Sequence, residues 1–253
     1  MQRIFQKQWH GIDFDSFWHG SSKKLAGSDF YRDFYRQFFQ TYHAPSDLNP
    51  SWLQRQDEIF HTLLTPELLG LPHERVLSVG CGLGILEGKL FSAGHTNVSV
   101  YEVSDAPLKW IRQVLPKKQI FLGNFPDCLG AEEKFDCILL SSVEYFFQQP
   151  ELIDFLKKVR ALLKPQGRCL VVSSSVIVQN SGLRNIYKRF REFVALALHK
   201  WQIRSLGQFW GYSRTVEEFQ SAMLSARFSG VDFAFFPKVG NWDTIWLRGI
   251  SSC

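Results

Sequence analysis

The segment VLSVGCGLG, residues 76–84, decides the fold of this chain. Its first four residues are apolar apart from one serine and predict a short buried strand. Glycines follow at alternate positions, Gly80, Gly82 and Gly84, and a helical pattern continues to about residue 93. Because glycine lacks a Cβ, it adopts positive φ and lets a ligand approach the backbone. A strand that passes through such a loop into a helix predicts a ligand site at the carboxyl end of an α/β sheet.

Loops of this kind bind two classes of ligand. A dinucleotide site follows G-x-G-x-x-G, in which the third glycine packs helix against strand beside a pyrophosphate. Here the third glycine comes one position early, at Gly84, and Ile85 occupies the position of the dinucleotide glycine. A tight turn that binds no ligand is the structural alternative.

The residues after the loop favour a nucleoside ligand. A second predicted strand, residues 97–102, ends on Glu102, whose carboxylate can accept hydrogen bonds from both hydroxyls of a ribose. Strands that alternate with helices predict a parallel sheet covered on both faces. Further strands are predicted at residues 119–122, 135–141 and 168–174.

The G-x-G-x-G loop, followed by these features in this order, resembles motif I of the class I methyltransferases, which bind S-adenosylmethionine (SAM) and release S-adenosylhomocysteine (SAH). The resemblance is close over residues 70–175 and looser over the last two predicted strands, 231–236 and 244–248. The segments that carry it after the loop are EVSDAPL at 102–108, GNF at 123–125, FDCILL at 135–140 and LLKPQGR at 162–168.

The resemblance implies an α/β fold with a Rossmann-like, seven-stranded, mostly parallel sheet whose last strand is antiparallel. It also implies an N-terminal helical extension and a helical insertion after strand five. Residues 1–66 are expected to form a helical cap, because apolar side chains recur at helical spacing over residues 30–42. Residues 67–253 are expected to form the SAM-binding domain, with a lid at 181–206.

Local patterns predict further helices. Asp29 is expected to cap the helix that follows it, since its carboxylate can accept from the first N–H groups. Helices are also expected from about residue 51 to 64 and from 104 to 114, the latter capped by Ser104.

The resemblance implies which residues contact SAM. Asn124 is expected to face the adenine amino group, and Val103 and Phe125 are expected to enclose the adenine ring. The complete expected set is Ser78, Gly80, Cys81, Gly82, Gly84, Glu102, Val103, Asn124, Phe125 and Ser142.

Methyl transfer mainly requires that acceptor, methyl group and sulfur be held in line, with a base only where the acceptor must lose a proton. Tyr145 follows the fourth strand and is a candidate for catalysis, with simple packing as the alternative. His199 is the candidate general base because its pKa lies near neutrality, although an isolated histidine on a helix is more often packed. No metal site is expected. The residues expected to contact the acceptor are Trp18, Tyr31, Glu144, Trp210, Tyr212 and Arg214.

The net charge of +5 is concentrated in one segment. Residues 184–204 hold six basic side chains and one acidic one, so the rest of the chain is balanced. A general nucleic-acid partner is therefore not expected. The segment is favoured as a lid over the acceptor, with a membrane-surface helix or a plain surface helix as alternatives. Cysteine spacing and the lack of a signal peptide or a membrane-length apolar run indicate a cytoplasmic protein.

The expected function is transfer of a methyl group from SAM to an oxygen or nitrogen atom of a small molecule, whether anionic or aromatic. One alternative is a lipid or quinone methyltransferase that docks on a membrane surface. The other is a protein that binds SAM without catalysis. The identity of the acceptor and the oligomeric state stay open.

Overall fold

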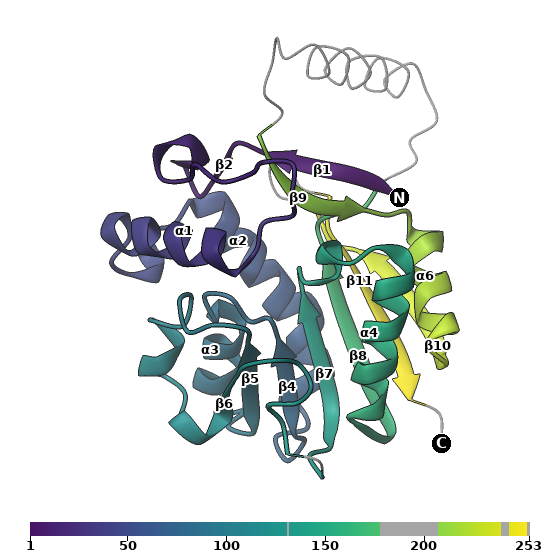
Figure 1. Ribbon diagram of the computed structural model, residues 1–253. Coiled ribbons are helices and arrows are strands. Elements are labelled where there is room, and N and C mark those ends of the chain that lie inside the picture. Colours follow the sequence, from purple (N-terminus) through teal and green to yellow (C-terminus); the bar gives the residue numbers. More distant parts are fainter. Residues whose placement is uncertain (131, 178–206, 239–242, 252–253) are drawn as a thin grey trace.

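The structure is a computed structural model, in which a sheet covered by helices lies beneath an N-terminal layer (Figure 1). The predicted insertion, residues 181–206 with His199, lies outside the described residues. Those that the structure describes are residues 1–130, 132–177, 207–238 and 243–251.

The sheet has seven strands in the order β10-β11-β8-β7-β4-β5-β6. The strands from β6 across to β8 are parallel, and β11 runs antiparallel to both β8 and β10. This arrangement confirms the predicted fold class. The strands are β4 Val76–Val79, β5 Val98–Glu102, β6 Ile120–Leu122, β7 Phe135–Ser141, β8 Leu163–Ser173, β10 Phe228–Phe235 and β11 Ile245–Ser251.

Two cores cover the two faces of the sheet. Successive side chains of a strand point to opposite faces, so Ile138 and Leu140 of β7 enter one core while Cys137 and Leu139 enter the other. The first core packs under α4 and α6, and the second packs under α3 and the π-helix η3. These helices are α3 Ile85–Ser92, α4 Gln149–Ala161, α6 Val216–Ser225 and η3 Phe60–Leu69.

The start of the chain differs from the helical cap that its aromatic pattern predicts. Residues 2–13 form strands, and β1 (Gln2–Gln6) pairs antiparallel with β9 (Gln208–Ser213). The remaining short strands, β2 Gln8–Trp9 and β3 Ile12–Asp13, pair with each other. The expectation of helix was wrong here because the partner of β1 lies about 200 residues away in the sequence, where local periodicity gives no signal.

The expected helices do form after this point, with two corrections. Helix α1 (Ser28–Thr41) has Gly27 at its N-cap, so Asp29 lies inside the first turn and does not cap it. Helix α2 (Pro50–Ile59) continues into η3. The helix expected at residues 104–114 is absent, and turns and a short 3₁₀ helix replace it. The 3₁₀ helices are η1 Phe14–Ser16, η2 Pro45–Asp47, η4 Ile111–Gln113, η5 Lys117–Gln119 and η6 Glu144–Phe146.

An aromatic layer joins the N-terminal segment to β9 above the carboxyl ends of the strands. Phe30, Phe34 and Phe38 recur on one buried face of α1. Trp210 of β9 meets this layer, with its ring 5.5 Å from Phe14 and 5.3 Å from Trp9. Such ring pairs add stability beyond the burial of area, so the layer holds a roof over the end of the sheet where α/β proteins bind ligands.

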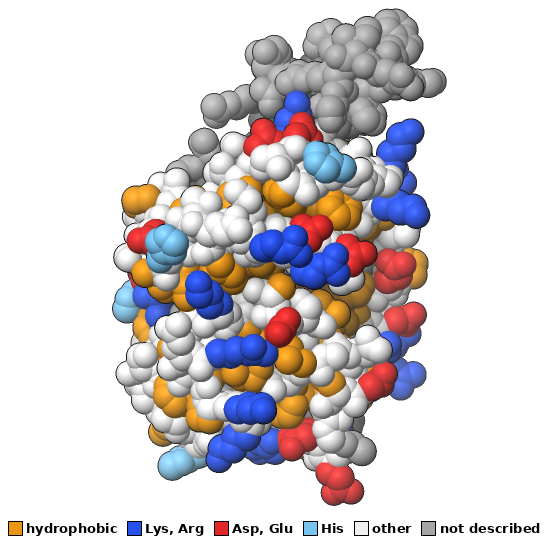
Figure 2. All heavy atoms as spheres, turned by 60° about the vertical axis from the view of Figure 1, so that its left-hand side comes forward, with side chains coloured by type: hydrophobic (Ala, Val, Ile, Leu, Met, Phe, Trp, Pro, Cys, Tyr) orange, Lys and Arg blue, Asp and Glu red, His pale blue; other side chains and the backbone are white. Residues whose placement is uncertain are grey.

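The outer face of this layer carries charges of both signs. Figure 2 shows basic and acidic side chains interspersed with apolar ones on the face it presents. On α1, Arg32 pairs with Asp29 and Arg36 pairs with Asp33 across exposed turns. Exposed pairs of this kind contribute little to stability, so the charges chiefly keep the face hydrated.

Candidate functional site

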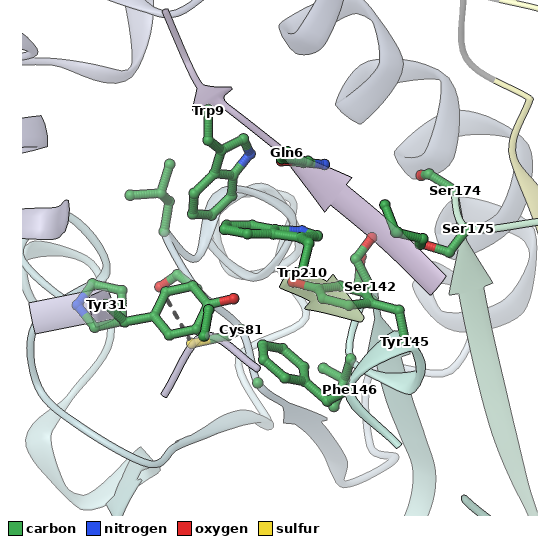
Figure 3. A pocket seen from close by; sticks show the side chains of 18 of the residues that line it. Gln6, Trp9, Tyr31, Cys81, Ser142, Tyr145, Phe146, Ser174, Ser175 and Trp210 are labelled. Carbon is green, nitrogen blue, oxygen red and sulfur yellow. Dashed lines mark hydrogen bonds between the residues drawn. The ribbon is translucent and has the colours of Figure 1, made fainter. Parts of the chain in front are cut away.

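A cavity of about 2450 Å³ separates the aromatic layer from the carboxyl ends of β4, β5, β7 and β8. Its floor includes the glycine loop and the residues that follow β7, and its roof includes β1, α1 and β9. Figure 3 shows aromatic side chains of both layers projecting into it. Ligands of open α/β sheets bind in this position.

The glycine loop turns at the end of β4 with three residues of positive φ, namely 70° at Gly80, 57° at Gly82 and 71° at Gly84. A Cβ on Gly80 would lie 2.5 Å from Val143, and one on Gly84 would lie 2.5 Å from Ile111, so these two glycines let the loop pack against its neighbours. A Cβ on Gly82 would meet only the Tyr35 hydroxyl, at 3.8 Å. The backbone at Gly82 is therefore open to the cavity and fits a ligand that approaches closely.

Glu102 lies beside this opening at the end of β5. Its Oε1 accepts a hydrogen bond from Gly82 N at 2.8 Å, and its Oε2 accepts one from Val103 N at 3.0 Å. Burial raises the pKa of this carboxyl, and the two N–H groups oppose that shift. Each carboxylate oxygen can accept a further bond, so Glu102 can accept from two neighbouring hydroxyls at once.

Apolar groups adjoin Glu102, as an adenine ring requires. Val103 is 58% exposed although it lines the cavity, and Phe125 lines the same region. The Phe125 ring is held against Tyr101 at 5.2 Å and Phe155 at 5.4 Å. The structure thus brings together the loop glycines with Cys81, Glu102, Val103, Phe125 and Ser142, all in the cavity lining.

Two residues expected to bind the cofactor lie outside that lining. Ser78 is fully buried, and its Oγ bonds to Glu87 Oε1 at 2.5 Å. Asn124 is exposed, and its carbonyl oxygen accepts from Cys128 N. Glu87, which the sequence did not single out, does line the cavity, and burial raises its pKa to about 7.

Aromatic side chains surround the space beyond the glycine loop. The Tyr145 ring stacks on Phe146 at 4.5 Å, and the Tyr31 ring lies 5.7 Å from both Phe146 and Trp210. In Figure 3 these side chains and Trp9 surround a common space. Burial raises the pKa of both tyrosines, so their phenols stay protonated at neutral pH and can donate hydrogen bonds. Tyr145 is therefore suited to positioning an acceptor and unsuited to acting as a base.

Arg214 does not face the cavity, contrary to expectation. It is fully buried and holds the turn η6 from behind. Its Nη1 donates to Glu144 O at 3.0 Å, its Nη2 donates to Phe147 O, and its Nε donates to Gln149 Oε1 at 2.9 Å. Arg214 thus positions the turn that carries Tyr145.

Three other residues that were expected to contact the acceptor also pack away from the cavity. The Glu144 side chain is 1% exposed and lies behind the cavity wall, where burial raises its pKa. Trp18 packs on Phe30, and its Nε1 donates to Gln208 Oε1 at 3.1 Å. Tyr212 is buried against Phe209, outside the lining. Of the acceptor residues predicted from the sequence, Tyr31 and Trp210 line the cavity.

Several lining residues had no clear signal in the sequence. Most of them come from β1, the β2–β3 hairpin and α2, which pairing with β9 and packing of the aromatic layer bring over the sheet, and one follows β8. A glycine loop can be recognised by its spacing, whereas isolated residues on separate elements cannot. The main examples are Gln6, Trp9, His10, Arg55 and Ser174.

Comparison with known proteins agrees with this geometry. A family profile described as a methyltransferase domain matches residues 51–228, more than half of the chain. A ubiquinone biosynthesis O-methyltransferase from Histophilus somni is 31% identical over 128 residues, covering 47% of this chain and 50% of that protein. The chain thus spans about half the length of this curated relative.

Solved structures share the fold. A magnesium protoporphyrin IX methyltransferase from Synechocystis with bound SAH has a TM-score of 0.60 at 16% identity, covering 90% of this chain and 96% of its own. A SAM-dependent methyltransferase from Thermotoga maritima, described as a possible histamine N-methyltransferase, has a TM-score of 0.54 at 17% identity, covering 88% and 98%.

A sheet of this order, with a glycine loop after β4 and an acidic side chain at the end of β5, defines the class I, SAM-dependent methyltransferases. The chain belongs to the methyltransferase-domain family, which confirms the membership predicted from its motifs. None of the helices in the described ranges combines the length and apolar composition needed to cross a membrane.

Proposed function

We propose that this chain transfers a methyl group from SAM to an oxygen or nitrogen atom of a small aromatic acceptor. The observation that carries the proposal is the continuity of one cavity from Glu102 and the open backbone at Gly82 to a space walled by aromatic rings. A nucleoside and a second, planar molecule would thereby meet within one enclosure.

The residues at the carboxyl ends of β4 and β5 are suited to hold the cofactor. Glu102 would accept hydrogen bonds from the ribose hydroxyls, Val103 and Phe125 would enclose the adenine, and Gly82 would let the ligand lie against the backbone. When bound, SAM supplies a methyl group made electrophilic by its positively charged sulfur.

The aromatic walls would orient the acceptor. The rings of Tyr31, Phe146 and Trp210 would restrict a planar acceptor to few orientations. Holding the acceptor in line is the main contribution that a protein makes to such a transfer. The Tyr145 hydroxyl would donate a hydrogen bond to the acceptor. The name of the Histophilus relative, an O-methyltransferase, supports oxygen as the receiving atom.

A direct test is to incubate the purified chain with isotopically labelled SAM and a panel of small phenols and aromatic amines, with mass spectrometry of the products. Tyr145→Phe keeps the stacked ring and removes the hydroxyl, so transfer should fall about tenfold while SAH affinity is unchanged. Tyr212→Phe, at a buried tyrosine outside the cavity lining, is the matched control and should leave transfer unchanged.

The outcomes separate the competing functions. If a folded protein binds SAH but methylates no member of the panel, a SAM-binding protein without catalysis becomes the better description. If the folded protein does not bind SAH, the proposal fails at the cofactor.

A further inference from the structure

The cavity wall at the glycine loop holds two polar side chains that the proposed ribose and adenine contacts do not use. Tyr35 comes from α1 in the roof and Glu87 comes from α3, and both line the cavity. The sulfur of SAM joins its nucleoside to an amino-acid end, which carries a carboxylate and an ammonium group. With the ribose at Glu102 and the sulfur facing the aromatic space, this end lies beside the glycine loop.

The Tyr35 hydroxyl lies above the open backbone of the loop. A Cβ on Gly82 would be 3.8 Å from the hydroxyl oxygen. The residue is 5% exposed, and in the part of the chain that the structure describes its hydroxyl has no hydrogen-bond partner. Burial raises the pKa of this phenol, so it stays protonated and can donate. Because buried hydroxyls are normally hydrogen-bonded, the Tyr35 hydroxyl is suited to bond with a ligand above the loop.

Glu87 is a buried carboxyl without a cationic partner. It is 2% exposed, and Ser78 Oγ donates to its Oε1 at 2.5 Å. Among the described residues no lysine or arginine pairs with it, and Lys89 of the same helix pairs with Asp57 at 2.6 Å. Burial raises the pKa of Glu87 to about 7. A cation that arrives beside this group would favour its carboxylate form and offset the cost of burying the charge.

The two side chains border the same part of the loop. Burial raises the pKa of the Cys81 thiol, and the carboxyls of Glu87 and Glu102 raise it further. Glu102 and Cys81 also add to the effect of burial on the pKa of Tyr35. Tyr35 and Glu87 are therefore both electrostatic neighbours of Cys81 and of the carboxyl proposed to bind the ribose.

We infer that Tyr35 and Glu87 bind the amino-acid end of the cofactor, with the Tyr35 hydroxyl donating to its carboxylate and Glu87 accepting from its ammonium group. A phenol can donate one hydrogen bond, and a carboxylate accepts from an ammonium group in a strong, charge-assisted bond. Contacts of opposite chemistry fix the orientation of this end, and with it the direction of the sulfur and its methyl group. The inference rests on the proposed function, since it takes the nucleoside to lie at Glu102.

The test uses ligands that lack one or both of these groups. Decarboxylated SAM keeps the ammonium group without the carboxylate, and 5′-methylthioadenosine has neither. In calorimetric titrations at neutral pH, Tyr35→Phe should weaken SAM about tenfold and leave the other two ligands unchanged. Glu87→Gln should weaken both SAM and decarboxylated SAM about tenfold and leave 5′-methylthioadenosine unchanged. SAH has both groups and a neutral sulfur, so it should follow SAM in both variants.

The controls separate a local contact from a general loss of structure. Tyr212→Phe changes a buried tyrosine outside the cavity lining, and Glu132→Gln changes an exposed glutamate, so neither should alter the affinity for any of the ligands. Thermal unfolding would verify that each variant is folded.

The outcomes distinguish this inference from the proposed function. If Tyr35→Phe weakens all the ligands equally, or none of them, the contact with the carboxylate is refuted. If Glu87→Gln weakens 5′-methylthioadenosine as much as SAM, or leaves SAM unchanged, the contact with the ammonium group is refuted. In each of these cases the wild type still binds SAM and the proposed function stands. A folded wild type that binds neither SAM nor SAH would overturn the proposed function and this inference with it.

Discussion

Glu102 offers the sharpest test of the cofactor site, because two backbone N–H groups hold its carboxylate. Gly82 N and Val103 N hold its two oxygens at 2.8 and 3.0 Å. A hydrogen bond to a charged group contributes about 1.5–3 kcal/mol. With the lower figure for each of two ribose hydroxyls, Glu102→Ala should lose about 3 kcal/mol of binding free energy. The affinity for SAH should therefore fall on the order of a hundredfold. Glu102→Gln keeps one acceptor oxygen and should cost on the order of tenfold.

Isothermal titration calorimetry with SAH measures both variants directly. The measurement belongs at mildly alkaline pH, because burial raises the pKa of Glu102 and the carboxylate must be ionised. Glu132→Ala, at an exposed glutamate, is the matched control and should bind like the wild type. Thermal unfolding would verify that each variant is folded. If SAH binds Glu102→Ala within about threefold of the wild type, the ribose assignment is refuted.

Three further predictions concern pH, the glycine loop and the turn that carries Tyr145. The pKa of Glu87 is raised from 4.5 to about 7, so through this window the folded chain keeps a proton that the unfolded chain loses, and stability falls as pH rises. The variant Glu87→Gln does not titrate, so its free energy of unfolding, measured in urea, should rise relative to that of the wild type by on the order of 3 kcal/mol as the pH goes from about 5 to about 8. A difference between the two proteins that does not change with pH would contradict this. Gly82→Ala and Gly94→Ala should each lower the free energy of unfolding by roughly 1 kcal/mol, because both glycines have a positive φ. Calorimetry should show weakened SAH binding only for Gly82→Ala, since the space beside Gly94 is open and lies away from the cavity. Equal effects of the two variants on SAH binding would contradict the open backbone at Gly82. Arg214→Met removes three buried hydrogen bonds and should lower the free energy of unfolding, measured in urea, by about 3–5 kcal/mol. It should also lower the rate of methyl transfer more than the affinity for SAH. A loss of stability below about 1 kcal/mol would argue against a structural role for Arg214.

The direction in which packing turns long side chains explains why the acceptor residues were poorly predicted from the sequence. Arg214 and Arg55 are both arginines, and the sequence favoured Arg214 because it lies beside Trp210 and Tyr212. In the structure Arg214 is enclosed behind η6, whereas Arg55 crosses from α2 to Ser174 and lines the cavity. The direction of a long side chain depends on the packing around it, which neighbours in sequence do not specify.

The sequence by itself determined the parts of this protein that contiguous residues encode. The loop of Gly80, Gly82 and Gly84 needs its spacing to turn at the end of β4, and Glu102 needs only its place at the end of the next strand. The alternation of strands and helices was also sufficient to predict a parallel sheet with helices on both faces. These features depend on local backbone conformation and hydrophobic periodicity, which a short window of sequence contains.

Only the tertiary structure decided what faces the ligand. Pairing of β1 with β9 turned an expected helical segment into strands and placed Gln6 and Trp210 in one cavity wall. All four of Ser78, Arg214, Glu87 and Arg55 are buried, but packing places the first two behind the site and the last two in the cavity lining. The physical reason is that pairing, burial and the pKa of a buried group are set by residues distant in sequence, so they are fixed only when the chain has folded.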